Sequence, residues 1–185
     1  MTISAATMPT PTGPLTLLVE GGRLVAAGFT GRPEDLQARL GPALREVGMR
    51  RLGDLGEFSA ALRAYFEGDV TAPDALPVDG AGTDHQQRVW KVLREVPAGT
   101  TVSYRTLAAR AGNPAAVRAA GTACARNLIA PVIPCHRVVR SDGGLGGYAY
   151  GLEVKRWLLD HERRHAAAPP PTVAHTPPGE HATGS

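Results

Sequence analysis

Residues 113–139, NPAAVRAAGTACARNLIAPVIPCHRVV, place a helix of small residues directly before an extended segment that carries a thiol. The opening asparagine suits a helix N-cap and the proline behind it suits the first turn, so we expect a helix from Ala115 to Arg126. After Asn127, two further prolines exclude a helix and predict extended chain as far as Val139.

A shorter helix is predicted just upstream, after Ser103 and before Gly112, with Tyr104 in its first turn. Two short helices joined by a tight glycine-containing turn form the outline of a helix-turn-helix. The second helix has almost no long polar side chain besides Arg118, although helices that read base edges need several. A slim helix approaches the minor groove closely, which predicts binding to DNA of any sequence through phosphates and shape. The alternative is an alanine-rich helix packed inside a small bundle.

A connection rich in proline and glycine, at residues 72–82, is the predicted domain boundary. It separates an N-terminal α/β domain, residues 1–80, from a mainly α C-terminal domain, residues 81–165. The N-terminal domain contains a predicted β-hairpin over residues 15–29, turning at paired glycines. An amphipathic helix is expected next, over residues 33–47, because leucines recur there at helical spacing.

Other segments are identified by their ends and by composition. A second N-terminal helix is predicted to start with a capping box of Asp54 and Glu57 and to end at Gly68. The last helix is expected over about residues 152–161. Residues 166–185 are rich in proline and almost free of large apolar side chains, which predicts a disordered tail.

The charge is distributed unevenly along the chain of 185 residues, whose formal net charge is +3. Residues 1–82 carry 7 basic and 10 acidic side chains, whereas residues 83–164 carry 13 basic and 6 acidic ones. A basic second half suggests a polyanionic partner, although a GC-rich genome would also explain the many arginines. No apolar run is long enough for a membrane span and no secretory signal precedes the first strand, so we expect a cytoplasmic protein.

The thiol of the quoted stretch has the neighbours that nucleophilic chemistry needs. Cys135 is followed by His136, and only two cysteines occur in the chain, too few for a disulfide scaffold. A cysteine attacks as a thiolate, so a neighbouring base must take its proton. A histidine does this when a carboxylate holds its other nitrogen, and Glu162 is the candidate for that role. On these residues alone, a structural cysteine is the alternative.

Three runs of sequence resemble one known family, and the first of them ends the stretch quoted above. PCHRVV at 134–139, SDGGLGGY at 141–148 and GLEVKRWLLDHE at 151–162 are similar to the O6-alkylguanine-DNA alkyltransferase family, the methylated-DNA–protein-cysteine methyltransferases. The similarity continues upstream through VWKVLREVPAGTTVSYRTLAARAGNPAAVRAAGTACARN and covers residues 83–162. It implies a ribonuclease-H-like N-terminal domain and a winged-helix-like C-terminal domain with a helix-turn-helix, which binds DNA and accepts the alkyl group.

The resemblance implies an irreversible and stoichiometric reaction. An alkyl group, methyl above all, passes from O6-alkylguanine in duplex DNA to Cys135, after the base has flipped into a pocket. O4-alkylthymine is a second candidate substrate. The alternatives are a sensor or helix-turn-helix module that binds alkylated DNA without transfer, and a cysteine hydrolase. The implied partner is double-stranded DNA with alkylated guanine, bound by a monomer, with cooperative clustering on DNA left open.

Family roles transfer to individual positions. Cys135 matches the acceptor, His136 the base that acts through a water molecule, Glu162 the carboxylate that orients it, and Asn127 the brace of the active-site turn. Tyr104 matches a tyrosine that crowds the 3′ phosphate and donates to the base. The implied DNA-binding residues, with Arg118 as the finger that enters the base stack, are Ser103, Tyr104, Arg118, Ala119, Thr122 and Ala125. The implied pocket residues are Cys124, Val138, Tyr148 and Ala149.

Three positions depart from the family pattern. Leu128 stands where many relatives have proline, and Ala149 stands where some have a serine that can bond the substrate oxygen. Cys124 occupies a place where other side chains are usual, and its simplest interpretation is a small packed thiol. The resemblance implies no cofactor. We expect no metal site, because the N-terminal half lacks the cysteines that bind zinc in some members.

Overall fold

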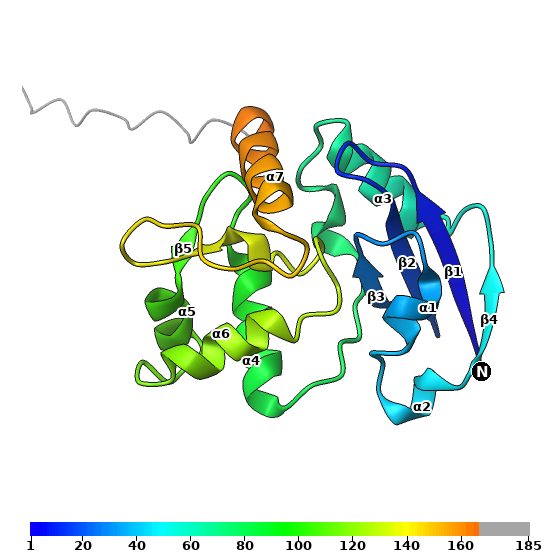
Figure 1. The fold of residues 1–185 in the computed structure, drawn as a ribbon, viewed down its shortest axis with the longest axis horizontal. Helices are drawn as coiled ribbons and strands as arrows, with labels where there is room; N and C mark the ends of the chain where they lie inside the picture. The colour runs from blue at the N-terminus through cyan, green and yellow to red at the C-terminus, as the bar shows by residue number, and fades with distance from the viewer. Residues whose placement is uncertain (167–185) are drawn as a thin grey trace, which may run out of the picture.

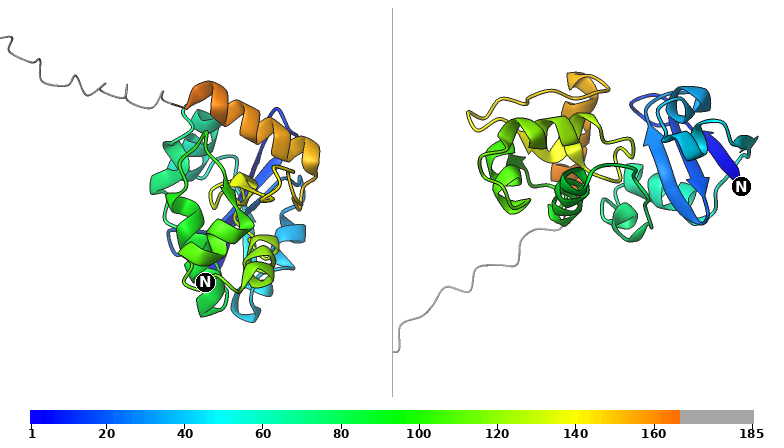
Figure 2. Two further views of the ribbon diagram at one scale, coloured as in Figure 1. Left: turned by 90° about the vertical axis from the view of Figure 1, so that its left-hand side faces the viewer. Right: turned by 90° about the horizontal axis from the view of Figure 1, so that it is seen from below.

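The computed structural model describes residues 1–166. Its first half is a sheet with helices and its second half is mainly helical, and the two halves lie side by side (Figures 1 and 2). The disorder predicted for the C-terminal tail concerns residues that, beyond Ala166, lie outside the described part of the chain. No helix in the described part is both long and apolar enough to cross a bilayer.

Four strands form one mixed sheet in the order β3-β2-β1-β4. The predicted hairpin is confirmed as antiparallel β2 and β3, whereas β1 and β4 were not predicted. The sequence of β4, GMRR, has few residues with high strand propensity, and its parallel pairing with β1 holds it in the sheet. The strands are β1 (Thr2–Met8), β2 (Leu15–Glu20), β3 (Arg23–Gly28) and β4 (Gly48–Arg51).

The single helix predicted over residues 33–47 is wrong. The chain forms two short helices instead, α1 (Pro33–Gln37) and α2 (Pro42–Arg45). Gly41 between them is extended, and Pro42 has no N–H with which to continue the first helix. Leucine spacing alone did not reveal the break.

The helix predicted after Asp54 exists as α3 (Glu57–Phe66), but the capping box does not form. Gly56 is the N-cap, and Asp54 lies too far upstream; its carboxylate accepts from the Gly56 N–H at 2.6 Å. Gly68 follows the helix at φ +118°, a conformation that favours glycine, as expected for a terminator.

The second half contains the predicted helices with shifted ends. Asn113 does not cap α6; its side chain accepts from the Ala115 N–H in a turn, and α6 starts later with Ala116 as N-cap. The extended segment is interrupted at Cys135 by a single 3₁₀ turn. After η1 (Ala72–Ala75) in the connection, the elements are α4 (Asp84–Glu95), β5 (Val102–Ser103), α5 (Tyr104–Arg110), α6 (Val117–Ala125), η2 (Cys135–Arg137), β6 (Val138–Val139) and α7 (Leu152–His165).

Backbone pairing joins the two halves along the free edge of β3. Ala27 donates to the Leu128 carbonyl at 2.8 Å and accepts from the Ala130 N–H at 3.0 Å. The last helix then returns to the first half, where Trp157 of α7 packs on Phe66 of α3 with ring centroids 5.8 Å apart. The thiol segment is therefore held between the sheet and α7 (Figure 1).

Candidate active site

Cys135 lies at a cavity of about 210 Å³ between the end of α6 and the glycine-rich loop before α7. Of the pocket residues predicted from sequence, Cys124, Tyr148 and Ala149 line this cavity. Val138 does not, because it is fully buried and its carbonyl accepts from Lys155. The complete lining is Tyr104, Gly121, Cys124, Ala125, Asn127, Cys135, Gly147, Tyr148, Ala149 and Tyr150.

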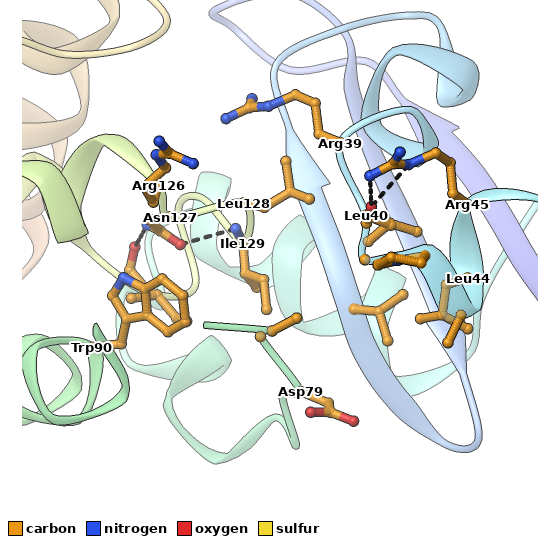
Figure 3. A pocket seen from close by; sticks show the side chains of 17 residues that line it. Arg39, Leu40, Leu44, Arg45, Asp79, Trp90, Arg126, Asn127, Leu128 and Ile129 are labelled. Carbon is orange, nitrogen blue, oxygen red and sulfur yellow. Dashed lines mark hydrogen bonds between the residues drawn. The ribbon is translucent and has the colours of Figure 1, made fainter. Parts of the chain in front are cut away.

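Asn127 connects the end of α6 to the thiol turn. Its amide donates to the Ile133 carbonyl at 2.8 Å and to the Cys135 sulfur at 3.2 Å, and its side-chain oxygen accepts from the Ile129 N–H at 2.9 Å. Figure 3 shows Asn127 bonded to the Ile129 N–H beside a second, larger and mainly apolar cavity that residues of both halves line. The Asn127 side chain therefore fixes the shape of the turn through Ile129 and Ile133 and also donates a hydrogen bond to the Cys135 sulfur.

Lys155 was not predicted from the sequence, although it lies within the run GLEVKRWLLDHE at 151–162. Its buried ammonium donates to the carbonyls of Val138 at 2.7 Å, Gly147 at 3.1 Å and Leu145. The lysine thereby holds the glycine-rich loop against the cavity. Burial raises the pKa of the Cys135 thiol, and the Asn127 amide and the Lys155 charge partly oppose that rise.

His136 and Glu162 are brought together, as the resemblance implied. The imidazole Nε2 lies 2.8 Å from Glu162 Oε2, and both side chains are fully buried. Because an ionised carboxylate only accepts hydrogen bonds, Nε2 carries the proton and Nδ1 is a free acceptor. Nδ1 is buried and has no hydrogen-bond partner within residues 1–166. Burial lowers the pKa of His136, so the imidazole is neutral and able to take a proton at Nδ1.

Two more side chains bind the same carboxylate, and neither was predicted. Arg137 donates from Nε to Oε1 at 2.8 Å and from Nη2 to Oε2 at 3.0 Å, and Tyr65 of α3 donates its hydroxyl to Oε2 at 2.7 Å. Burial alone would raise the pKa of Glu162, but the His136 imidazole and the Arg137 guanidinium lower it well below its ordinary value. The carboxylate therefore stays ionised.

Known proteins resemble this chain over most of its length. Residues 84–164 match the family described as 6-O-methylguanine DNA methyltransferase, DNA binding domain. A methylated-DNA–protein-cysteine methyltransferase of Shigella flexneri is 40% identical over 156 residues, which is 83% of this chain and 91% of the relative. The chain belongs to this methyltransferase family.

Other relatives agree with the methyltransferase assignment. The protein of the same name from Mycobacterium tuberculosis is 40% identical over 166 residues, or 88% of this chain and 93% of that one. A solved structure of the O6-methylguanine methyltransferase of that organism, 36% identical, superposes with a TM-score of 0.75 over 90% of this chain and 96% of its own. Its OGT in complex with DNA gives a TM-score of 0.76, with 89% and 96% covered. The resemblance found in the sequence is thus confirmed, and so is a fold with a mixed α/β part and a helical part.

In this methyltransferase, α6 presents one face to solvent and one to the core. Ala120 and Ala123 are fully buried, and the Ala123 carbonyl accepts from the Trp90 indole at 2.8 Å. The residues predicted to contact DNA occupy the exposed face: Arg118, Ala119, Thr122 and Ala125. The packed-helix alternative accounts for only one side of this helix.

The two remaining predicted DNA contacts lie where α5 begins. The Ser103 hydroxyl caps α5 by accepting from the Thr106 N–H at 3.0 Å, which leaves Tyr104 in the first turn and at the cavity wall. Gly121 of α6 faces Tyr104, and a Cβ added there would lie 4.0 Å from the tyrosine ring. Within residues 1–166, no cluster of three or more histidine, cysteine, aspartate or glutamate side chains could hold a metal ion.

Proposed function

We propose that this protein repairs double-stranded DNA by moving an alkyl group, methyl above all, from O6 of guanine to the Cys135 sulfur. The observation that carries the proposal is a free thiol at a partly open cavity, with the Asn127 amide 3.2 Å from its sulfur and the His136 imidazole next in the chain. A base that is stacked inside the DNA double helix cannot reach this cavity, so the damaged nucleotide has to flip out of the duplex.

The proposed reaction has one covalent step. The Cys135 thiol gives its proton to Nδ1 of His136, through a water molecule as in the family, and the Glu162 carboxylate stabilises the imidazolium that forms. The thiolate attacks the alkyl carbon, the bond from that carbon to O6 breaks, and guanine leaves with the electron pair and regains a proton. The product is a thioether, which no ordinary step reverses, so each molecule acts once.

DNA binding is assigned to the exposed face of α6, with α5 as the other helix of a helix-turn-helix. Arg118 stands exposed near the start of α6 and fills the space that the flipped base leaves, while the small side chains beside it allow close approach to the minor groove. Tyr104, at the cavity wall, crowds the phosphate and turns the nucleotide toward Cys135.

We propose the same domain division as the sequence indicated: residues 1–80, residues 81–165 and a tail. The strand order β3-β2-β1-β4, with three antiparallel strands and one parallel strand, supports a ribonuclease-H-like first domain. The packing of α4, α5 and α6 beside the β5–β6 pair supports a winged-helix-like second domain. We expect the protein to be cytoplasmic and to bind DNA as a monomer.

Intact mass tests the proposed function. The reduced protein is mixed with a duplex that contains one O6-methylguanine, and with the same duplex without the lesion. We expect the mass to rise by one methyl group with the lesion only, on the peptide that contains Cys135. Binding without a mass gain would identify an alkylated-DNA sensor instead, and release of a small hydrolysed product from an unmodified protein would identify a hydrolase.

Arg118→Ala tests the base-flipping part. We expect repair of the duplex to slow by about 10- to 100-fold, because an unstacked base pair that nothing replaces costs a few kcal/mol. Reaction with free O6-methylguanine base should be unchanged, because no stack has to be opened. Arg50→Ala is the matched control, because it removes an exposed arginine of β4 that is not among the predicted DNA contacts, and it should leave both rates unchanged. Equal slowing with duplex and free base would remove the finger role.

A further inference from the structure

The two oxygens of the Glu162 carboxylate are used unequally. Oε2 accepts three hydrogen bonds, from His136 Nε2 at 2.8 Å, Arg137 Nη2 at 3.0 Å and the Tyr65 hydroxyl at 2.7 Å. Oε1 accepts one, from Arg137 Nε at 2.8 Å. A carboxylate oxygen has two lone pairs, so the three donors on Oε2 compete with one another. The tyrosine hydroxyl and the imidazole share the same acceptor atom.

Tyr65 is held so that its hydroxyl has one direction to point. The side chain is 2% exposed, and its ring meets Phe66 and His161 edge-on, with centroids 5.0 Å and 5.3 Å away. The Tyr65 carbonyl lies 2.6 Å from His161 Nε2, one residue before Glu162 on α7. Both ends of this residue therefore bind the same turn of α7, although 97 residues separate Tyr65 from Glu162.

The other charged groups around the His136 imidazole either bind partners of their own or make no hydrogen bond to Glu162 Oε2 that the imidazole shares with a neutral donor. Arg137 binds both carboxylate oxygens, and Lys155 of α7 acts on His136 while binding three carbonyls of its own. Asp74 of η1 interacts electrically with Arg137 and Glu162, and the Tyr148 ring packs edge-on to His136 at 6.4 Å. Cys135 precedes the imidazole in the 3₁₀ turn. Among these groups, Tyr65 is the neutral donor that shares Oε2 with His136.

We propose that Tyr65 is a positioning residue of the alkyl-transfer site, through which the N-terminal half sets how firmly Glu162 holds a proton on His136. This inference rests on the proposed function. The hydroxyl weakens the pull of Oε2 on the imidazole, so Nδ1 stays unprotonated and ready to take the thiol proton. Without the hydroxyl, the same carboxylate would favour the imidazolium more strongly.

The direction of the effect follows from the forces on His136. Burial lowers the pKa of its imidazole, and Glu162 opposes that effect. When one donor is removed from Oε2, the carboxylate interacts more strongly with the protonated imidazole, and the pKa of His136 rises. An imidazole that is already protonated cannot accept a proton from Cys135. As the pH is lowered, the variant without the hydroxyl should therefore lose activity at a higher pH than the unchanged protein does.

Tyr65→Phe tests this with the full chain and an O6-methylguanine duplex. The rate of methyl gain is followed by intact mass across the pH range in which the protein stays folded. We expect the acid limb of the profile to move to higher pH by about one unit, the scale of one hydrogen bond to a charged group. Ser59→Ala is the control, because it removes another buried hydroxyl of α3, one that accepts from the Leu55 N–H and is not among the donors to Glu162. The control should lower stability and leave the limb in place.

A second substitution tests the sign without removing the ring contacts. Incorporation of 3-fluorotyrosine at position 65 makes the hydroxyl a stronger donor, so the acid limb should move to lower pH. An unmoved limb in both Tyr65 variants, or a shift in the same direction for both, would overturn the inference. If the unchanged protein gains no methyl at any pH, the proposed function itself has failed, which is a different result.

Discussion

Cys135→Ser is expected to abolish methyl gain from O6-methylguanine DNA while the variant still binds the duplex. A serine hydroxyl beside a neutral imidazole stays protonated, and the soft, ionisable sulfur that the displacement needs is gone. We expect the transfer rate to fall by on the order of a thousandfold or more, the scale of removing a nucleophile. Intact mass after prolonged incubation measures the loss, and a gel-shift titration with the same duplex measures binding.

The other cysteine provides the comparison. Cys124 lines the same cavity, and burial raises the pKa of its thiol to about 12. Burial raises the pKa of Cys135 too, but Cys135 has the Asn127 amide at its sulfur and a histidine beside it, whereas no histidine adjoins Cys124, which makes Cys124 the poorer source of thiolate. Cys124→Ser should still end with one methyl group on the peptide that contains Cys135. A methyl group found on Cys124 in the Cys135→Ser protein would contradict the assignment of the acceptor. Loss of DNA binding in that variant would contradict the separation of the pocket from the DNA surface.

Sequence reasoning found the parts of the site that are contiguous in the chain. Cys135 and His136 are neighbours, Asn127 lies eight residues upstream within the same motif, and all three meet at one turn because prolines and the asparagine side chain fix its path. Glu162, in the predicted last helix, was a candidate from the chemistry of a cysteine-histidine pair, and the family resemblance gave it the same role. The DNA-facing side of α6 was predicted because its side chains are small where a helix that reads base edges would carry long polar ones.

The missed residues share a physical reason. Tyr65, Arg137 and Lys155 act through buried contacts whose partners lie far away or on the backbone, and no spacing rule relates such pairs. Arg137 lies beside His136, but nothing in its neighbours along the chain indicates that its guanidinium is buried against Glu162. The helix predicted over residues 33–47 failed for the opposite reason, since a local signal at Gly41 and Pro42 outweighed the apolar period.

Buried hydrogen bonds connect the first half of the chain to the candidate site in the second half. The edge of β3 fixes the segment before the thiol through Ala27, and α3 supplies a donor to the Glu162 carboxylate through Tyr65. Both contacts are buried hydrogen bonds, which are costly to leave unmade. The two halves therefore position one site together, although Cys135 and His136, the proposed acceptor and base, both lie in the second half.

Glu162→Gln has the second largest expected effect, on both stability and transfer. The amide cannot accept from all four donors, and the Arg137 charge, whose side chain is 5% exposed, loses its counter-charge. Breaking such a buried pair lowers the free energy of unfolding by about 3–5 kcal/mol. Transfer slows as well, because nothing then stabilises the imidazolium of His136. Urea unfolding at neutral pH and the single-turnover rate measure the two effects.

Asp160→Asn is the matched control on α7, because Asp160 pairs with Arg163 at the surface, where both side chains are about half exposed or more. It should change the free energy of unfolding by less than about 1 kcal/mol. The pH dependence separates the two carboxylates further. The pKa of Glu162 lies well below its ordinary 4.5 in the folded protein, so its contribution to stability is complete above that pH and is lost as the pH falls toward the folded value. The Gln variant should therefore lose less stability than the unchanged protein on acidification below pH 4.5, and an equal loss would mean that Glu162 is not the buried, ionised partner of Arg137 and His136.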